Sequence, residues 1–294
     1  MSYNPDPTAA PEAPASFFAL PGHRVIALSG RDAVVFAQAQ LMNDVDAAPP
    51  GHWQWTGWLT PKGRVIAVLA LVRLAADALW LIVPDADAAE LATKLQRYVL
   101  RRQLVVSVRE DLHVSGRFSA PEIAHGASFD GDETRGVELD VSGFGIRRTL
   151  RIDRQGAPHD AALDAQWLAS DLRLGFPRLP ASQAEQWTPQ MLSLERLHAY
   201  SVKKGCYPGQ EIVARTHFLG QAKRGLVFFE APEAPEPGAN VDVGAASLGQ
   251  IVSVARNGAQ WAALAVLPFD RPDAPHFAKG ILLRERALLA GLAR

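Results

Sequence analysis

The sequence predicts an α+β protein that ends in a small β-barrel, and three observations carry this prediction. Between residues 23 and 108, the segments follow the order strand, helix, strand, strand, helix, strand, which is typical of a split α+β unit. A helical pattern then covers residues 161–174 and ends at Gly175, with Pro177 just beyond. After Arg224, short β-type runs alternate with turns rich in Pro and Gly, as in a small barrel.

The first unit is expected to contain two helices and a prominent hairpin. Asp32 precedes one helical pattern, and Asp85 is placed to cap the second. The turn sequence that starts at Thr60 and ends at Gly63 joins two β-type runs, so Lys62 should lie near a hairpin tip. The strands are expected at residues 23–28, 53–59, 65–72, 79–83 and 104–108.

The rest of the chain is expected to fall into a weakly patterned region, the isolated helix and the barrel. Residues 115–156 carry scattered glycines and only short β-like pieces. The barrel strands are expected at 226–229, 247–254, 261–267 and 280–286. The predicted organisation is a flexible arm at 1–16, a folded region at 17–224 and the barrel at 225–294.

Composition narrows the class of protein. The chain has 294 residues, 48% of them hydrophobic and 21% charged, which is typical of a globular protein. The formal net charge of −1 provides no general attraction to DNA or to an anionic membrane. The Pro- and Ala-rich N-terminal stretch lacks the features of a secretory signal, and no apolar run is long enough to cross a bilayer. A cytoplasmic location is therefore expected. The eight histidines show no metal-ligating spacing, so no metal site is predicted.

The most informative segment surrounds Cys206, the one cysteine of the chain. Tyr207 and the three residues after it suit a type II turn, with Pro208 setting φ and Gly209 accepting a positive φ. Two lysines directly before the thiol would favour the thiolate, although Glu211 could oppose them. A histidine close in sequence, at position 198 or 217, could also pair with the thiol. Gly205 would let the backbone approach another group closely. The alternative from spacing alone is a small buried cysteine, with the glycines serving only the turn.

The run Lys204-Gly205-Cys206-Tyr207-Pro208-Gly209-Gln210-Glu211 resembles the K-G-C-Y-x-G-Q-E signature of the YgfZ family at every fixed position. Other landmarks follow in the family's order. Gln40 to Val45 resembles its Q-x-T-N-D-V stretch, and residues 60–64 resemble its lysine–glycine hairpin. Trp167-Leu168, residues 175–177 and residues 188–190 resemble its W-L, G-F/I-P and P-Q segments.

This resemblance implies a T-protein-like fold of two α+β lobes and a C-terminal β-barrel around a tetrahydrofolate site. It implies an accessory protein that binds a reduced folate and maintains iron–sulfur enzymes, including those that modify tRNA. The signature cysteine maps to Cys206, supported by Lys204, Gly205, Tyr207, Gly209, Gln210 and Glu211. The folate-contacting tryptophan maps to Trp167, and further folate contacts are expected at Lys62, Asn43, Gln40, Trp55 and Arg215.

Three departures from the relatives bear on folate chemistry. Aminomethyltransferases of this fold carry an acidic residue in the strand after the hairpin, but residues 65–70 offer none, which argues against one-carbon transfer. The glutamate that usually precedes the G-F/I-P segment is replaced by Arg173, and Asp171 is expected to face another side of the helix. His23 stands where a tryptophan is expected.

Several of the residues assigned to ligand binding also have a simpler structural explanation. Trp53, Trp55 and Trp58 could wall a flat heteroaromatic ligand or belong to the core of a strand. Lys62 could meet the glutamate tail of folate or be an ordinary surface charge, and Arg215 could bind an anion or form a surface ion pair. For the whole protein, the alternatives are a folate-dependent aminomethyltransferase and a structural module with an inert thiol.

Overall fold

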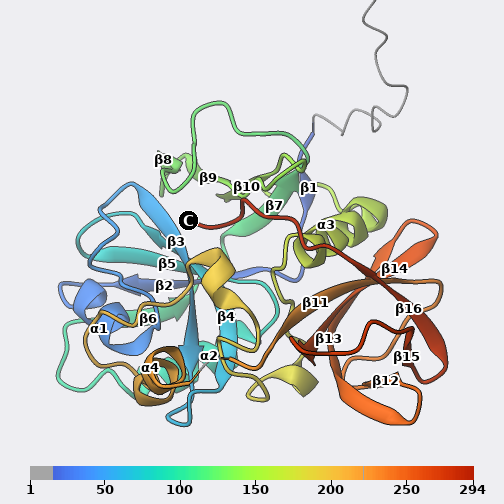
Figure 1. The fold of residues 1–294 in the computed structure, drawn as a ribbon. Helices are drawn as coiled ribbons and strands as arrows, with labels where there is room; N and C mark the ends of the chain where they lie inside the picture. Colours follow the sequence, from blue (N-terminus) through green and yellow to red (C-terminus); the bar gives the residue numbers. More distant parts are fainter. Residues whose placement is uncertain (1–15, 221) are drawn as a thin grey trace, which may run out of the picture.

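A computed structural model describes residues 16–220 and 222–294 (Figure 1). All but the last residue of the predicted arm at 1–16 lies outside these residues. The described chain forms two five-stranded sheets and a closed barrel, so the predicted α+β class with a terminal barrel is confirmed. Within the described residues, no helix is both long and apolar enough to cross a membrane.

The first lobe is an antiparallel sheet covered by helices α1 and α2 on one face. Its strands run in the order β3-β4-β5-β2-β6. The elements are β2 (Arg24–Ser29), α1 (Ala33–Gln40), β3 (His52–Leu59), β4 (Val65–Arg73), β5 (Ala78–Val83), α2 (Ala88–Gln96) and β6 (Val105–Val108). The five strands and two helices predicted for this region are confirmed, with three strands between the two helices instead of the two in the predicted order.

Strand β4 shows why the sequence of this lobe is strongly apolar. Side chains alternate between the two faces of a strand. Leu69 and Leu71 pack beneath α1 and α2, while Ala70 and Val72 face the second lobe. A strand that is covered on both faces needs apolar residues at every position.

The second lobe is a sheet that the sequence did not resolve strand by strand. Its order is β1-β7-β10-β9-β8, and helix α3 (Ala161–Arg173) packs between this lobe and the barrel. The strands are β1 (Phe18–Ala19), β7 (His113–Arg117), β8 (Asp130–Asp132), β9 (Gly136–Asp140) and β10 (Thr149–Asp153).

The barrel closes in the order β11-β14-β13-β12-β15-β16. Its strands are β11 (Arg224–Ala231), β12 (Asn240–Val243), β13 (Ala246–Asn257), β14 (Gln260–Pro268), β15 (His276–Ala278) and β16 (Ile281–Arg286). Four of these match the predicted strands, and the short β12 and β15 were not predicted. Between α3 and the barrel lie the 3-10 helices η1 (Ala181–Gln183) and η2 (Leu194–Leu197) and helix α4 (Gln210–Phe218). The boundaries at 17–224 and 225–294 stay a prediction.

One local prediction was wrong. Helix α2 is capped by Asp87, whose carboxylate accepts hydrogen bonds from the amides of Ala89 and Glu90. The predicted cap, Asp85, instead accepts hydrogen bonds from Arg178 and from the amide of Leu179.

Candidate functional site: the signature loop and the interlobe cavity

The signature segment forms the predicted type II turn at the start of α4. Gly209 adopts φ 79° and ψ 0°, the values of the third residue of such a turn. The amide of Gln210 donates to the Tyr207 carbonyl at 3.1 Å and closes the turn. Pro208 precedes Gly209 and holds the φ that the second position requires. The turn prediction is confirmed.

The two glycines of the hairpin and the turn lie against each other. A Cβ added to Gly209 would stand 2.7 Å from the Gly63 Cα, and one added to Gly63 would stand 2.9 Å from the Ile212 Cβ. This contact brings the tip of the β3–β4 hairpin to the signature loop. The close approach was predicted at Gly205, and that was wrong, because a Cβ there would meet nothing within 4 Å.

Lys204 fastens the loop to the first lobe. Its ammonium donates to the carbonyls of Gln38, Leu41 and Asn43 at 2.6, 2.6 and 2.9 Å, at the C-terminal end of α1. These are carbonyls that a helix end leaves without partners, and the negative end of the helix dipole favours a cation there. Burial lowers the pKa of this ammonium to about 8. The Lys204 ammonium was predicted to favour the Cys206 thiolate, but it binds the end of α1 instead.

Other signature side chains also make contacts within the chain. The Tyr207 hydroxyl donates to the Ser201 carbonyl at 3.2 Å, and its ring lies beside the Lys204 ammonium at 5.1 Å. The side-chain amide of Gln210 donates to the Lys204 carbonyl at 3.0 Å. These contacts fix the conformation of the loop from both sides of Cys206.

Cys206 itself is exposed. The alternative of a small buried cysteine is therefore wrong. Glu211 is also exposed, in the first turn of the following helix. No hydrogen bond joins Cys206 to His198 or His217 among the described residues, so the predicted thiol–imidazole pair is not formed. The structure presents the thiol to solvent from a loop whose neighbouring side chains are held in place.

Asn43 and Gln40, predicted as folate contacts, lie beside this loop. The Asn43 amide donates to the carbonyls of Trp55 and His198 at 2.8 and 2.7 Å, so it ties β3 to the segment after η2. Gln40 is half-buried at the end of α1, and its buried Oε1 has no hydrogen-bond partner within the described part of the chain. Their folate contacts stay predictions.

Lys62 and Arg215 are exposed on the hairpin tip and on α4. No ion pair joins Arg215 to Glu211 among the described residues. Arg64, the other cation near the tip, donates to the Gln186 carbonyl at 2.6 Å. Lys62 and Arg215 therefore add positive charge to the face of the signature loop, and their folate contacts also stay predictions.

A groove of about 610 Å³ runs between η2, the signature loop and the end of α4. Gln190 lies in its wall, and its Nε2 donates a hydrogen bond to the Val213 carbonyl. Its buried Oε1 has no hydrogen-bond partner among the residues that the structure describes. Burial also raises the pKa of the Glu195 carboxyl in this wall. The groove is lined further by Asn43, Asp44, His198, Tyr200, Ser201, Lys203, Thr216 and His217.

A second cavity lies between the two lobes and contains the predicted Trp167. Trp167 is 2% exposed, and the Arg148 guanidinium lies 4.5 Å from its ring. Trp55 and Phe176 form another part of the wall, with ring centroids 4.7 Å apart. Trp53, Trp55 and Trp58 of β3 are all buried, as the core alternative expects, and the folate contacts of Trp55 and Trp167 stay predictions.

Buried charges cross this cavity in a network that the sequence did not predict. Asp171 accepts from Arg148 at 2.7 Å and from Arg178 at 3.0 Å, and Arg178 also donates to Asp85 at 2.8 Å. Asp171 therefore faces the cavity. Arg173 packs instead on the Phe228 ring of the barrel at 4.9 Å. Asp171 and Arg173 thus lie on different sides of α3, as the two-residue spacing between them predicts.

The residues present do not fit a folate in this conformation. The cavity measures about 20 Å³, the space of a single water, whereas pockets for small organic ligands measure about 300–1,000 Å³. The side chains of Arg148, Trp55 and Phe176 line this small cavity.

Comparison with known proteins agrees with this architecture. No protein-family model matches the chain. The chain is 28% identical to the tRNA-modifying protein YgfZ of Serratia proteamaculans, over 81% of this chain and 77% of that protein. It is 26% identical to the YgfZ protein of Cronobacter sakazakii, over 83% and 81% of the two chains. The glycine cleavage system aminomethyltransferase T of Bartonella henselae superposes with a TM-score of 0.71 at 15% identity, covering 92% of this chain and 85% of that one.

The fold is thus that of the glycine-cleavage aminomethyltransferases, with two α+β lobes and a closed barrel. In sequence the chain is similar to the tRNA-modifying protein YgfZ of several bacteria, and the resemblance predicted from the signature segment is confirmed.

Proposed function

We propose that this protein is an accessory factor that maintains iron–sulfur enzymes, including enzymes that modify tRNA, and that Cys206 is its reactive group. The observation that carries the proposal is an exposed thiol in a loop whose neighbouring side chains are held by hydrogen bonds. Lys204, Tyr207 and Gln210 each make hydrogen bonds within the chain, while Cys206 is exposed. An exposed thiol on a fixed loop is suited to react with a partner protein. The name of the relatives, tRNA-modifying protein, supports the choice of client.

Complementation of a bacterium that lacks its own YgfZ tests this proposal. The readout is methylthiolated tRNA, with wild type, Cys206→Ala and Cys206→Ser compared at equal expression. Gly205→Ala is the matched control, because its Cβ would enter open space. We expect wild type and the control to restore the modification and both cysteine variants to fail. Rescue by Cys206→Ala would remove the thiol from the function, and failure of wild type at good expression would refute the proposal as a whole.

The aminomethyltransferase alternative is disfavoured by β4. Its residues from Val65 to Val72 are all apolar, so no carboxylate on this strand can orient a reacting amine. Incubation with an aminomethyl donor and tetrahydrofolate should yield no methylene-tetrahydrofolate above the uncatalysed level. Turnover that depends on the protein would favour the enzyme over the accessory factor.

A reduced folate remains part of the proposal as the ligand of the region between the lobes. The T-protein-like fold and the YgfZ resemblance support this ligand. Because the cavity as described does not accommodate it, the role proposed for Cys206 includes no step through folate.

A further inference from the structure

The segment that follows β16, residues 287–294, leaves the barrel and lies between the two lobes (Figure 1). It forms neither helix nor strand. The Leu289 amide donates to the Arg173 carbonyl at 3.0 Å, and the Phe144 amide donates to the Ala290 carbonyl at 2.8 Å. Gly291 adopts φ 92°, and a Cβ there would stand 3.0 Å from the Phe144 nitrogen. A glycine is thus needed where the segment turns towards the cavity.

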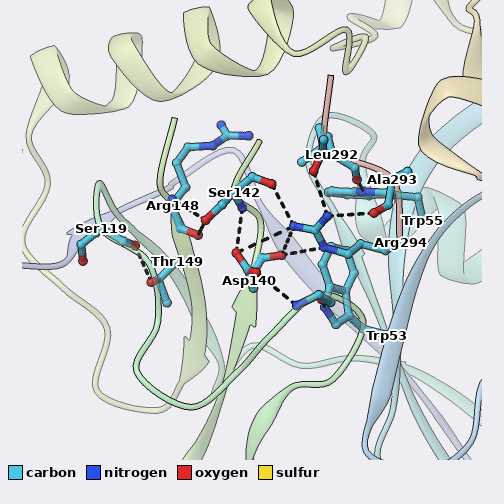
Figure 2. Close-up of polar contacts among 12 residues, drawn as sticks. Trp53, Trp55, Ser119, Asp140, Ser142, Arg148, Thr149, Leu292, Ala293 and Arg294 are labelled. Atoms are coloured by element: carbon cyan, nitrogen blue, oxygen red, sulfur yellow. Dashed lines mark hydrogen bonds and ion pairs between the residues drawn. The ribbon is translucent and has the colours of Figure 1, made fainter. Parts of the chain in front are cut away.

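Leu292 joins this segment directly to the cavity wall. Its side chain is 1% exposed within the central core, and its carbonyl accepts a hydrogen bond from Trp55 Nε1 at 2.7 Å (Figure 2). Trp55 also lines the interlobe cavity. The segment therefore holds in place one of the aromatic rings that keep the cavity small.

Arg294 connects the end of this segment to both lobes. Its Nε donates to the Asp140 carbonyl at 2.9 Å, and its Nη2 donates to the carbonyls of Asp140 and Ser142 at 2.7 and 2.8 Å (Figure 2). The guanidinium lies 5.6 Å from the Trp53 ring, and the side chain is 7% exposed. The arginine thus spans from β9 of the second lobe to β3 of the first.

The acceptors of this buried cation are mainly neutral. The Asp140 Oδ1 atom is 3.8 Å from Arg294 Nη2, outside hydrogen-bond distance. The two Asp140 carboxylate oxygens accept instead from the amides of Ser142 and Gly126. Hydrogen bonds to backbone carbonyls offset less of the free-energy cost of burying a charge than a direct contact with a carboxylate does. The contact therefore holds the segment in place without making its release prohibitive.

We infer that residues 287–294 are an intramolecular strap over the interlobe cavity, with Arg294 as its latch, and that a folate-sized ligand binds only when this strap is displaced. The inference rests on the folate ligand of the proposed function. It explains why a fold shared with an aminomethyltransferase encloses a cavity of only about 20 Å³ here. A segment without regular structure opens locally at lower cost than a strand in a sheet.

The strap and a ligand-gripping arginine predict opposite effects of Arg294→Ala. If Arg294 latches a closed state, its loss raises the fraction of open protein, and the apparent affinity rises in proportion. If Arg294 instead grips the anionic glutamate tail of the folate, its loss weakens binding. The direction of the change in affinity therefore decides between the two roles.

The test measures binding of 5-formyl-tetrahydrofolate, a stable reduced folate, by titration calorimetry. Arg294→Ala is compared with wild type and with Arg256→Ala, which removes an exposed arginine of the barrel. We expect Arg294→Ala to bind about tenfold more tightly and the control to match wild type. Hydrogen exchange follows the Leu289 and Arg294 amides, which should exchange faster when the ligand is added to wild type.

The outcomes separate the two proposals. Equal or weaker binding by Arg294→Ala overturns the strap but leaves the folate ligand in place. Binding to wild type with unchanged exchange at residues 289–294 also overturns it. If wild type, Arg294→Ala and a chain that stops after Arg286 are all folded and all fail to bind, the folate ligand itself is refuted, and the strap loses its proposed role with it.

Discussion

Gly209 lies directly on Gly63, so that a Cβ at position 209 would stand 2.7 Å from the Gly63 Cα and 2.7 Å from the Thr60 carbonyl oxygen. Both neighbours are backbone atoms, which cannot rotate away. Gly209 also has φ 79°, a region that other residues enter at a cost. This contact joins the signature turn to the hairpin of the first lobe.

Gly209→Ala should therefore destabilise the protein by about 2–4 kcal/mol, from the clash and the strained backbone together. Urea denaturation followed by fluorescence measures the change. Gly205→Ala, four residues earlier in the same loop, is the control and should change the stability by less than about 0.5 kcal/mol. Equal effects of the two substitutions would show that the Gly209 contact does not fix the loop.

Lys204→Met should destabilise the protein by about 2–4 kcal/mol at pH 7, because three buried carbonyls at the end of α1 lose a charged donor. Methionine retains most of the aliphatic length of the side chain, so the loss reports the ammonium. Lys203→Met removes the adjacent exposed lysine and should have an effect of less than about 0.5 kcal/mol. A similar small effect at Lys204 would contradict the anchoring role.

The parts of the fold that the sequence predicted are those with a strong local pattern. The hairpin around Lys62 has long apolar strands and a Pro-Gly turn, and the turn at Gly209 depends on its own four residues. The second lobe escaped prediction because its strands are short and contain Gly and Asp. Strand β8 consists of Asp130, Gly131 and Asp132, which have low strand propensity.

The contacts of the candidate site depend on chain segments that are far apart. Lys204 binds carbonyls more than 160 positions earlier, and the Trp55 indole binds Leu292, 237 positions later. No spacing rule reports such pairs. The charge network of Asp171 escaped prediction for the same reason, since its partners Arg148 and Arg178 come from other segments.

His23 should make the protein less stable in mild acid. Burial, and then the charges of Arg178, Arg148 and Arg24, hold the pKa of His23 well below its usual value. The unfolded chain gains a proton on His23 near pH 6.5, while the folded protein does not. The unfolded state thus binds more protons below about pH 6.5, and the stability falls as the pH decreases.

His23→Gln should reduce this acid sensitivity. The measurement compares the loss of unfolding free energy between pH 7 and pH 5 in wild type and in the variant, by urea denaturation at each pH. His159→Gln, at an exposed histidine, should keep the pH dependence of wild type. If His23→Gln and wild type lose the same stability over this range, the buried neutral imidazole is not the cause.

Asp171→Asn should be among the most destabilising single changes, at about 3–5 kcal/mol. The carboxylate is the charged partner of Arg148, which is 1% exposed, and a second partner of Arg178. An asparagine amide keeps the shape but leaves the Arg148 charge buried without a carboxylate. Asp164→Asn, two turns earlier on α3, is the matched control, because burial already raises the pKa of that carboxyl and favours its neutral form. We expect thermal unfolding to show a large fall in midpoint for Asp171→Asn and little change for Asp164→Asn, and equal midpoints would mean that the network between the lobes does not stabilise their packing.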